Sequence, residues 1–151
     1  SLGNVHTDLK EYNEAISSYQ KAIEINPRIV GAHNNLGLVY RVLNDLGSAV
    51  ESYKRAIKIQ PKHGGAYHNL ALAYKELGKF DQSIESHQKA IECEPENFAH
   101  YYYLSELKKD ILNQNLKNKI EKSFSGNKLT KKNNAFGNYL LAKYERKSKN
   151  Y

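Results

Sequence analysis

The sequence predicts an all-α protein built from repeated pairs of helices. The stretch AHNNLGLVY at 32–40 returns as AYHNLALAY at 66–74, which sets a 34-residue period. Apolar residues within both stretches recur at the spacing of three or four that places side chains on one face of a helix. The chain's three prolines, Pro27, Pro61 and Pro95, keep the same 34-residue step. Each proline is expected to end a helix, because proline cannot continue one.

The 34-residue period divides residues up to 110 into an array of units. Residues 30–63 and 64–97 form two complete units, which are identical at 12 of 34 aligned positions. We assign residues 1–29 to the latter part of an earlier unit and residues 98–110 to the first helix of a fourth. Residues 111–151 follow as a basic helical extension, which we interpret as a truncated continuation or a cap of the array.

Each complete unit is predicted to contain two helices joined by a tight turn. In the first complete unit, Leu36, Tyr40 and Leu43 mark one helix by their spacing. The turn is NDLG at 44–47. The apolar positions of the second helix are Ala49, Val50, Tyr53, Ala56 and Ile57. One hairpin cannot bury both of its faces, so neighbouring units must stack.

Small and bulky residues are placed so that the two helices of a hairpin can pack closely. Gly37 and Ala71 would allow the first helix of each unit to approach its partner. Tyr40, Tyr53 and Tyr74 would fill the space between crossing helices, with a hydroxyl able to reach a polar partner at the rim.

The same residues resemble the tetratricopeptide repeat (TPR) family. The matching positions of the first complete unit are Leu36, Gly37, Tyr40, Ala49, Tyr53, Ala56 and Pro61. Those of the partial unit before it are Leu2, Gly3, Ala15, Tyr19, Ala22 and Pro27. The resemblance implies a right-handed α-solenoid of TPR helix-turn-helix hairpins, here with extra C-terminal helices. It also implies a protein-interaction module whose first helices line a concave groove for an extended peptide or a partner domain.

Two adjacent amides, Asn34 and Asn35, are predicted to face this groove. Because Leu36, Tyr40 and Leu43 define the buried face, residues 34 and 35 turn partly away from the partner helix. A side-chain amide offers both a donor and an acceptor to a peptide backbone. The predicted groove residues of the whole array are Asn4, Asn34, Asn35, Leu38, Arg41, His68, Asn69, Leu72, Lys75, Tyr102, Glu106 and Lys109.

Asparagines that recur in this place resemble the asparagine ladder of O-linked N-acetylglucosamine transferases, with Asn35 and Asn69 as matching rungs. The carboxylate clamp of chaperone-binding TPR domains is a competing comparison, which needs Lys and Arg beside Asn. It is disfavoured because Gly65 and Asn69 occupy the cationic places. Cations recur with the repeat period at Arg41, Lys75 and Lys109. They indicate a preference for anionic ligands that is weaker than that of a carboxylate clamp. In a third interpretation, the two asparagines only bond to neighbouring helices or water.

The C-terminal part of the chain carries all of its net positive charge. Lys and Arg minus Asp and Glu gives 11 − 13 = −2 for residues 1–106 and 12 − 3 = +9 for residues 107–151. Such asymmetry is also typical of nucleic-acid binding. Here the apolar spacing of Leu116, Ile120 and Phe124 predicts an amphipathic helix with the lysines on its outer face. Phe136, Leu140 and Tyr144 predict another such helix, so nucleic acid is not the expected partner.

Gly126 is expected to end the first of these helices, and Thr130 is expected to cap the second. The ending YLLAKYERKSKNY resembles the first helix of a further hairpin. In that alignment Leu141 and Ala142 take the places of Leu36 and Gly37, and Tyr151 lies near the place of Leu46.

Residues 98–146 also resemble the linker of bacterial sulfotransferases that carry N-terminal TPR repeats. That resemblance implies a parent enzyme using the donor 3′-phosphoadenosine 5′-phosphosulfate. The phosphate-binding loop of such an enzyme is absent from this chain. The alternative function is therefore a substrate-positioning arm of a larger transferase, either sulfotransferase-like or glycosyltransferase-like, whose catalytic domain lies outside this sequence.

No catalytic residue, cofactor or metal site is predicted within the chain. His63 and His68 are five apart, which does not place them on one helical face. A single cysteine excludes an internal disulfide framework and fits a reducing, cytoplasmic compartment. We expect a soluble protein without a membrane-spanning segment. The expected partner is a protein or peptide, and self-association through exposed ends of the solenoid is a further alternative.

Overall fold

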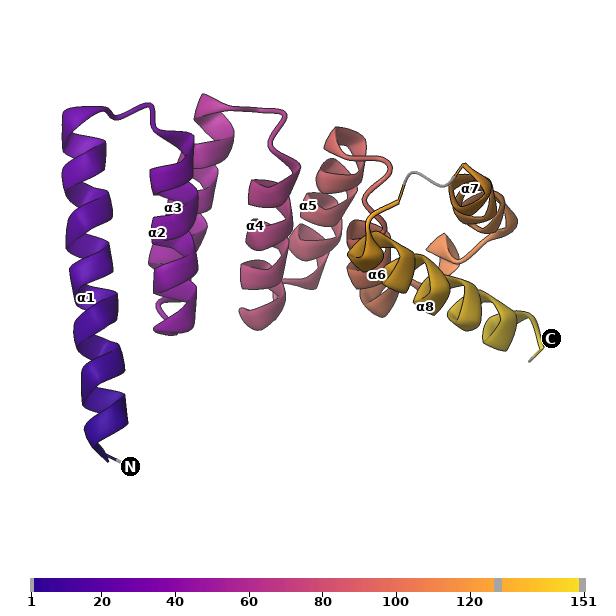
Figure 1. Cartoon of the computed structure of the whole chain (residues 1–151), viewed down its shortest axis with the longest axis horizontal. Helices are drawn as coiled ribbons and strands as arrows, with labels where there is room; N and C mark the ends of the chain where they lie inside the picture. The colour runs from indigo at the N-terminus through magenta and orange to yellow at the C-terminus, as the bar shows by residue number, and fades with distance from the viewer. Residues whose placement is uncertain (1, 127–128, 150–151) are drawn as a thin grey trace. The chain divides into compact units, whose positions relative to one another are not determined.

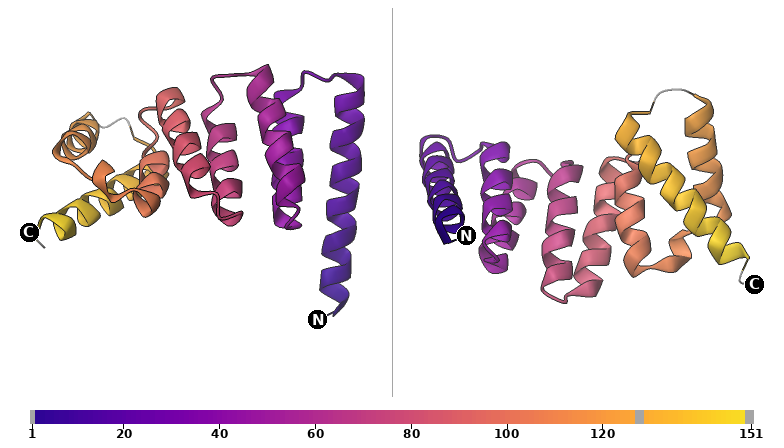
Figure 2. Two further views of the ribbon diagram at one scale, coloured as in Figure 1. Left: turned by 180° about the vertical axis from the view of Figure 1, so that it is seen from behind. Right: turned by 60° about the horizontal axis from the view of Figure 1, so that its bottom comes forward.

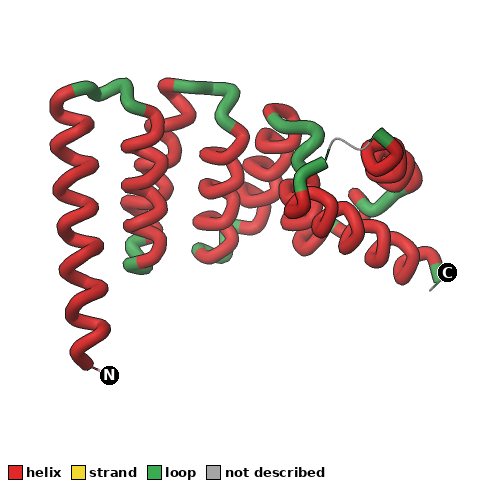
Figure 3. Tube along the Cα trace, viewed as in Figure 1, coloured by secondary structure: helices red, strands yellow, loops and turns green. Residues whose placement is uncertain are grey.

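The computed structural model describes the backbone of residues 2–126 and 129–149 and the side chains of residues 9–126 and 129–149. Over these residues every regular element is helical, so the all-α prediction is confirmed (Figure 3). The elements are α1 (Leu2–Ile25), α2 (Val30–Val42), α3 (Leu46–Ile59), α4 (Gly64–Glu76), α5 (Phe80–Cys93), α6 (Phe98–Leu107), the 3₁₀ helix η1 (Lys109–Ile111), α7 (Gln114–Ser125) and α8 (Lys131–Ser148).

Figure 1 labels the α-helices along the chain. They belong to two compact units, Ser1–Ser86 and His87–Tyr151, which divide the chain within α5. This division precedes the boundary after residue 110 that the charge and the repeat pattern suggested. The boundary after residue 110 reflects a change of composition, whereas the compact units reflect backbone packing. The predicted array of 1–110 and extension of 111–151 therefore stay predictions.

The helix ends and turns predicted for the two complete units are present. Helices α1, α3 and α5 each end two residues before a proline, at Ile25, Ile59 and Cys93. Helices α2 and α3 pack against each other as a hairpin. Its turn contains Asn44 in a left-handed conformation with φ 60°, and Gly78, the equivalent position of the next unit, has φ 72°. Asparagine and glycine tolerate this conformation better than other residues.

The first helix departs from the repeat pattern, because residues 2–25 form one continuous helix. The pattern aligned Leu2 and Gly3 with the first helix of a hairpin and Ala15 with the second. Lys10 stands one repeat period before Asn44, at the place where the later units adopt positive φ. A lysine there favours continuation of the right-handed helix over a left-handed turn.

The core of the first unit lies between α2, α3 and α4. The side chains of Ala49, Tyr53 and Ala56 on α3 have no exposed surface. Val50, Leu70, Ala73 and Tyr74 complete the cluster around them. Gly37 packs closely against the ring of Tyr53, so a Cβ atom at this position would be 2.5 Å from Tyr53 Cε1. The predicted pairing of a small residue on α2 with a bulky one on α3 is therefore present.

The second unit is built around α6, with α8 packed against both α6 and α7 (Figure 2). Its most buried side chains include Phe98, Leu104, Ile120 and Leu140. Both predicted amphipathic helices form as α7 and α8. Gly126 is the C-cap of α7, and Thr130 is the N-cap of α8, where its Oγ1 accepts from Asn133 N at 3.2 Å.

Two details of the C-terminal prediction are wrong. Helix α6 ends at Leu107 instead of continuing to residue 110, because the chain turns into η1 to reach α7. The aligned small residue Ala142 is exposed and does not take the place of Gly37. Gly137 provides the close approach in α8, and its Cβ position is 2.7 Å from Phe124 Cζ. Tyr151, the last aligned residue, lies outside the described residues.

The side chain of Asn133 links the start of α8 to the start of α6 through two hydrogen bonds. Its Oδ1 accepts from Phe98 N at 2.7 Å, and its Nδ2 donates to Glu96 O at 2.6 Å. The amide thus satisfies a donor at the first residue of α6, which the helix itself leaves without a partner. Phe98 is fully buried, so loss of this bond would leave its N–H with little access to water.

We expect Asn133→Ala to lower the free energy of unfolding by about 1–3 kcal/mol, because it leaves two polar backbone groups without their side-chain partner. Asn134→Ala is the matched control, since this neighbouring side chain makes no hydrogen bond to the described residues. Urea denaturation followed by circular dichroism measures both variants. Equal losses in the two variants would contradict the bridging role of Asn133.

Candidate functional site

The predicted groove residues of the first unit lie on the neighbouring helices α2 and α4. Asn34, Asn35, Leu38 and Arg41 on α2 are half-buried. On α4, His68, Asn69 and Leu72 are half-buried and Lys75 is exposed. Partial burial of polar side chains on adjacent helices is consistent with a surface that retains access to solvent. These residues form the α2–α4 surface.

An amide pair joins the two helices of this surface. Asn69 Nδ2 donates to Asn34 Oδ1 at 3.0 Å. In the repeat alignment Asn69 is equivalent to Asn35, and its hydrogen-bond partner is the residue before Asn35. The interpretation in which Asn69 bonds to a neighbouring helix is thus realised. Each amide still keeps unused hydrogen-bonding capacity, because Asn34 retains its NH₂ group and Asn69 retains its carbonyl oxygen.

Asn35 contributes a third amide beside the pair. Within the described part of the chain its side chain makes no hydrogen bond, and it is half-buried. A half-buried amide without an internal partner is best satisfied by water or by a ligand. Among the three amides, Asn35 is therefore the one whose hydrogen-bonding groups are most available to a ligand.

The three cations expected to favour anions have different surroundings. Arg41 Nε lies 3.3 Å from Glu76 Oε1, so the charge of Arg41 is offset by a carboxylate on α4. Burial raises the pKa of the Tyr53 hydroxyl to about 12, and the nearby Arg41 charge acts in the opposite direction. Lys75 is exposed, and Lys109 lies in η1 rather than on a first helix. The preference for anions expected from these three cations is weakened accordingly.

The groove residues predicted for the second unit have different surroundings. The ring of Tyr102 lies against those of Phe136 and Tyr139, with centroid distances of 5.3 and 6.1 Å. Glu106 pairs with Lys143 of α8. Asn4 falls in α1, but its side chain is outside the described residues.

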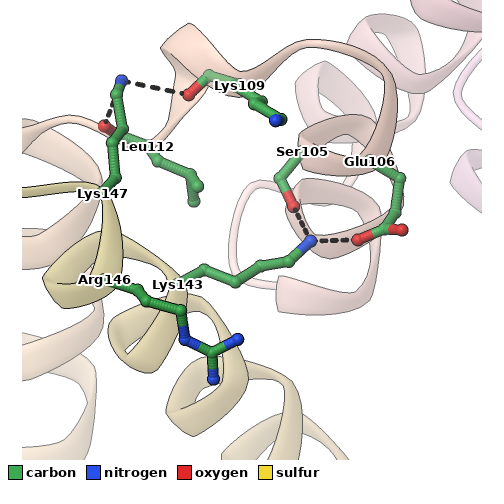
Figure 4. A pocket seen from close by; sticks show the side chains of 7 residues that line it. All are labelled: Ser105, Glu106, Lys109, Leu112, Lys143, Arg146 and Lys147. Atoms are coloured by element: carbon green, nitrogen blue, oxygen red, sulfur yellow. Dashed lines mark hydrogen bonds and ion pairs between the residues drawn. The ribbon is translucent and has the colours of Figure 1, made fainter. Parts of the chain in front are cut away.

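A cavity of about 620 Å³ opens between α6, η1 and α8 (Figure 4). Its lining residues are Ser105, Glu106, Lys109, Leu112, Lys143, Arg146 and Lys147. Sequence reasoning missed the three cations of α8 because it assigned them to outer helix faces. Lys143 and Lys147 are four residues apart and so share one face of α8, which is the signal that was available.

Neither a metal centre nor a membrane span stands out in the regions that the structure covers. Among the described residues no group of three or more His, Cys, Asp or Glu side chains could hold a metal ion. None of the helices searched there is both long and apolar enough to cross a bilayer.

Helical hairpins that repeat with one period and carry a polar first-helix surface define a helical repeat protein of the interaction type. The family described as TPR repeat matches residues 3–41 and 37–78, and the family described as tetratricopeptide repeat matches residues 65–97. The chain belongs to the tetratricopeptide repeat family. The family matches end at residue 97, so the resemblance of residues 98–146 to sulfotransferase linkers stays a prediction.

Solved structures of TPR proteins share this fold. A crystal structure of MamA has 24% sequence identity and a TM-score of 0.64, and the match covers 98% of this chain and 77% of that one. The first TPR domain of Spaghetti (RPAP3), bound to the HSP90 peptide SRMEEVD, has 22% identity and a TM-score of 0.63 over 74% of this chain and 88% of that chain. MamA from Desulfovibrio magneticus RS-1 has 24% identity and a TM-score of 0.60, over 70% and 60% of the two chains. No curated protein sequence matches the chain.

Proposed function

We propose that this chain is a noncatalytic module that binds an extended peptide segment of another protein along the α2–α4 surface. The observation that supports this most directly is the arrangement of amides. Asn34 and Asn69 fix each other's orientation through their hydrogen bond, and Asn35 lies beside them without an internal partner among the described residues. Preorganised amides lose little conformational entropy when they bind a ligand.

The α2–α4 surface offers both kinds of contact that a peptide needs. The free NH₂ group of Asn34 and the carbonyl of Asn69 can pair with an acceptor and a donor of a peptide backbone. Leu38 and Leu72 are half-buried beside the amides and can receive apolar side chains. Because backbone groups are common to all peptides, the amides would contribute affinity for any peptide sequence. The apolar contacts would determine which peptide sequences are preferred.

The solved RPAP3 domain with an HSP90 peptide supports peptide binding by this fold. The acidic peptide in that structure does not transfer directly to the α2–α4 surface. Gly65 and Asn69 stand where the clamp comparison requires cations, and Arg41 is already paired with Glu76. We therefore propose that the α2–α4 surface recognises the peptide backbone instead of a terminal carboxylate.

This proposal predicts that Asn35→Ala weakens peptide binding without destabilising the fold. Peptides are first selected from a phage-displayed random library on the unaltered protein, and their affinities are then measured by fluorescence polarisation. We expect Kd to rise about threefold to tenfold, which corresponds to the loss of one or two hydrogen bonds to a ligand. The melting temperature should stay within about 2 °C, because Asn35 has no hydrogen bond to the described residues to lose.

Gln88→Ala is the matched control, since it removes an exposed amide from the other class of helix. The control should leave Kd unchanged. Unchanged affinity in Asn35→Ala, or an equal loss in both variants, would count against the α2–α4 surface as the binding site.

A further inference from the structure

The cavity between α6, η1 and α8 contains two cations that the described residues do not neutralise. Lys109 and Arg146 both line it, and neither side chain makes a hydrogen bond or ion pair with the residues that the structure describes. Figure 4 shows their nitrogen atoms without interactions drawn to the other lining residues. These two positively charged side chains are therefore available to bind an anion.

The other two cations are held in place by the cavity wall. Lys147 Nζ donates to the carbonyl oxygens of Lys109 and Leu112, at 3.2 Å each. Lys143 Nζ donates to Ser105 Oγ at 3.1 Å and pairs with Glu106. The lining thus carries four positive charges and one negative charge, a balance of 4 − 1 = +3. The anchored Lys143 and Lys147 add positive potential to the lining, and the exposed Lys109 and Arg146 are left for direct contact with an anion.

An aromatic surface adjoins this cavity. Lys143 Nζ lies 4.9 Å from the centre of the Tyr102 ring, so one side chain contacts both the cavity and the aromatic cluster. The Tyr139 side chain is 62% exposed although its ring lies against Tyr102. Exposed tyrosine beside cations is typical of residues that dominate the energy of protein interfaces.

We propose that the cavity and the adjoining tyrosines form a second binding site, for an acidic peptide segment with an apolar residue next to its carboxylates. Lys109 and Arg146 would bind the carboxylates, and Tyr139 would contact the apolar side chain. The floor of the cavity includes Leu112, which is 6% exposed. The cavity volume of about 620 Å³ exceeds what a single small anion needs and falls in the range of sites for larger ligands.

Charge and lining favour a peptide over a nucleic acid. Among the described lining residues, Lys109 and Arg146 are the two cations whose side chains make no hydrogen bond or ion pair there, whereas nucleic-acid affinity depends on several simultaneous phosphate contacts. Sites for single-stranded nucleic acid stack successive bases on several aromatic side chains, whereas the described lining of the cavity has none and the adjoining Tyr139 offers a single exposed ring. The site lies wholly in the second compact unit, so it does not depend on the proposed α2–α4 surface.

The test uses a short fluorescein-labelled peptide in which glutamate alternates with leucine, measured by fluorescence anisotropy with the full chain. Lys109→Gln with Arg146→Gln should raise Kd about tenfold, because two charge-assisted contacts are lost. Lys131→Gln with Lys132→Gln removes the same charge from exposed positions of α8 and should raise Kd less than about twofold. The control pair precedes Lys143 by roughly 18 Å along the helix.

Further arms test the apolar contact and the class of ligand. Tyr139→Ala should raise Kd about fivefold, whereas exposed Asn138→Ala should leave it unchanged. A peptide with glutamine in place of glutamate should bind at least about tenfold more weakly. Asn35→Ala should not change the affinity for the acidic peptide.

Several results would overturn the site. Equal losses in the two double variants would show a general charge effect. Tighter binding of an oligonucleotide of equal charge, lost in Lys109→Gln with Arg146→Gln, would assign the cavity to nucleic acid. Loss of acidic-peptide binding in Asn35→Ala would place that peptide on the α2–α4 surface, which would reject this site and leave the proposed function standing.

Discussion

Replacing Gly37 with alanine is expected to lower the free energy of unfolding of the first unit by about 1–3 kcal/mol. The added Cβ would lie 2.5 Å from Cε1 and 2.7 Å from Cδ1 of Tyr53. Real Cβ atoms do not tolerate such distances, so α2 must move or the ring must turn. Tyr53 has no exposed surface and is surrounded by other core residues, which leaves its ring little room to turn.

Gly31→Ala provides a control in the same helix. A Cβ at Gly31 meets no atom within 4 Å, and this residue is exposed. Alanine there should be neutral or stabilise by up to about 1 kcal/mol, because alanine has the higher helix propensity. Urea denaturation gives both values. A loss at Gly37 no larger than the change at Gly31 would show that the α2–α3 contact is not tight.

A second substitution should relieve the collision at residue 37. The next repeat has Ala71 and His87 at the places of Gly37 and Tyr53, so a larger residue and a smaller ring occur together in the sequence. Gly37→Ala with Tyr53→His should therefore lose less stability than the sum of the two single variants. A double-mutant cycle measures this coupling. Strict additivity would argue against a direct collision.

Gly137→Ala is expected to destabilise the second unit by about 1–3 kcal/mol. Its Cβ would lie 2.7 Å from Phe124 Cζ, 2.9 Å from Phe124 Cε1 and 3.2 Å from Ile120 Cγ2. Ile120 is fully buried, so α8 would have to move away from α7. That movement would also shift Lys143 and Lys147, which follow on the same helix and line the cavity.

The comparison variant for Gly137 is Asn138→Ala, which changes an exposed neighbour on α8 and should stay within about 0.5 kcal/mol. Unfolding in urea measures stability, and anisotropy with the glutamate–leucine peptide measures the cavity. We expect Gly137→Ala to weaken both and Asn138→Ala to weaken neither. Full stability of Gly137→Ala would contradict the tight crossing of α7 and α8.

Much of the local structure could be predicted because it depends on residues near one another in the sequence. The prolines at 27, 61 and 95 each follow a helix end, and the predicted turn at Asn44 and Asp45 separates α2 from α3. Gly126 and Thr130 act at the helix ends where the sequence placed them. The continuous helix α1 was not predicted, because the resemblance to the TPR pattern implied two helices in this segment. Lys10 was the one residue that favoured continuation of the helix.

The candidate sites could be predicted only in part. The sequence indicated which faces of α2 and α4 carry amides, but the hydrogen bond joins Asn69 to Asn34 and not to Asn35. A hydrogen bond between helices depends on how the helices are rotated and offset relative to each other. A shift of one residue along a helix turns the direction of the side chain by about 100°. Repeat alignment compares equivalent positions and carries no information about that offset.

By itself, the sequence determined that this protein is an array of helical hairpins with a 34-residue step, because helix periodicity, turn residues and prolines act locally. Only the tertiary structure decided that Arg41 is paired with Glu76 and that α8 packs against α6 beside an open cationic cavity. These contacts join residues far apart in the chain, such as Lys143 and Ser105. Their geometry is set by how whole helices pack, and no local pattern encodes it.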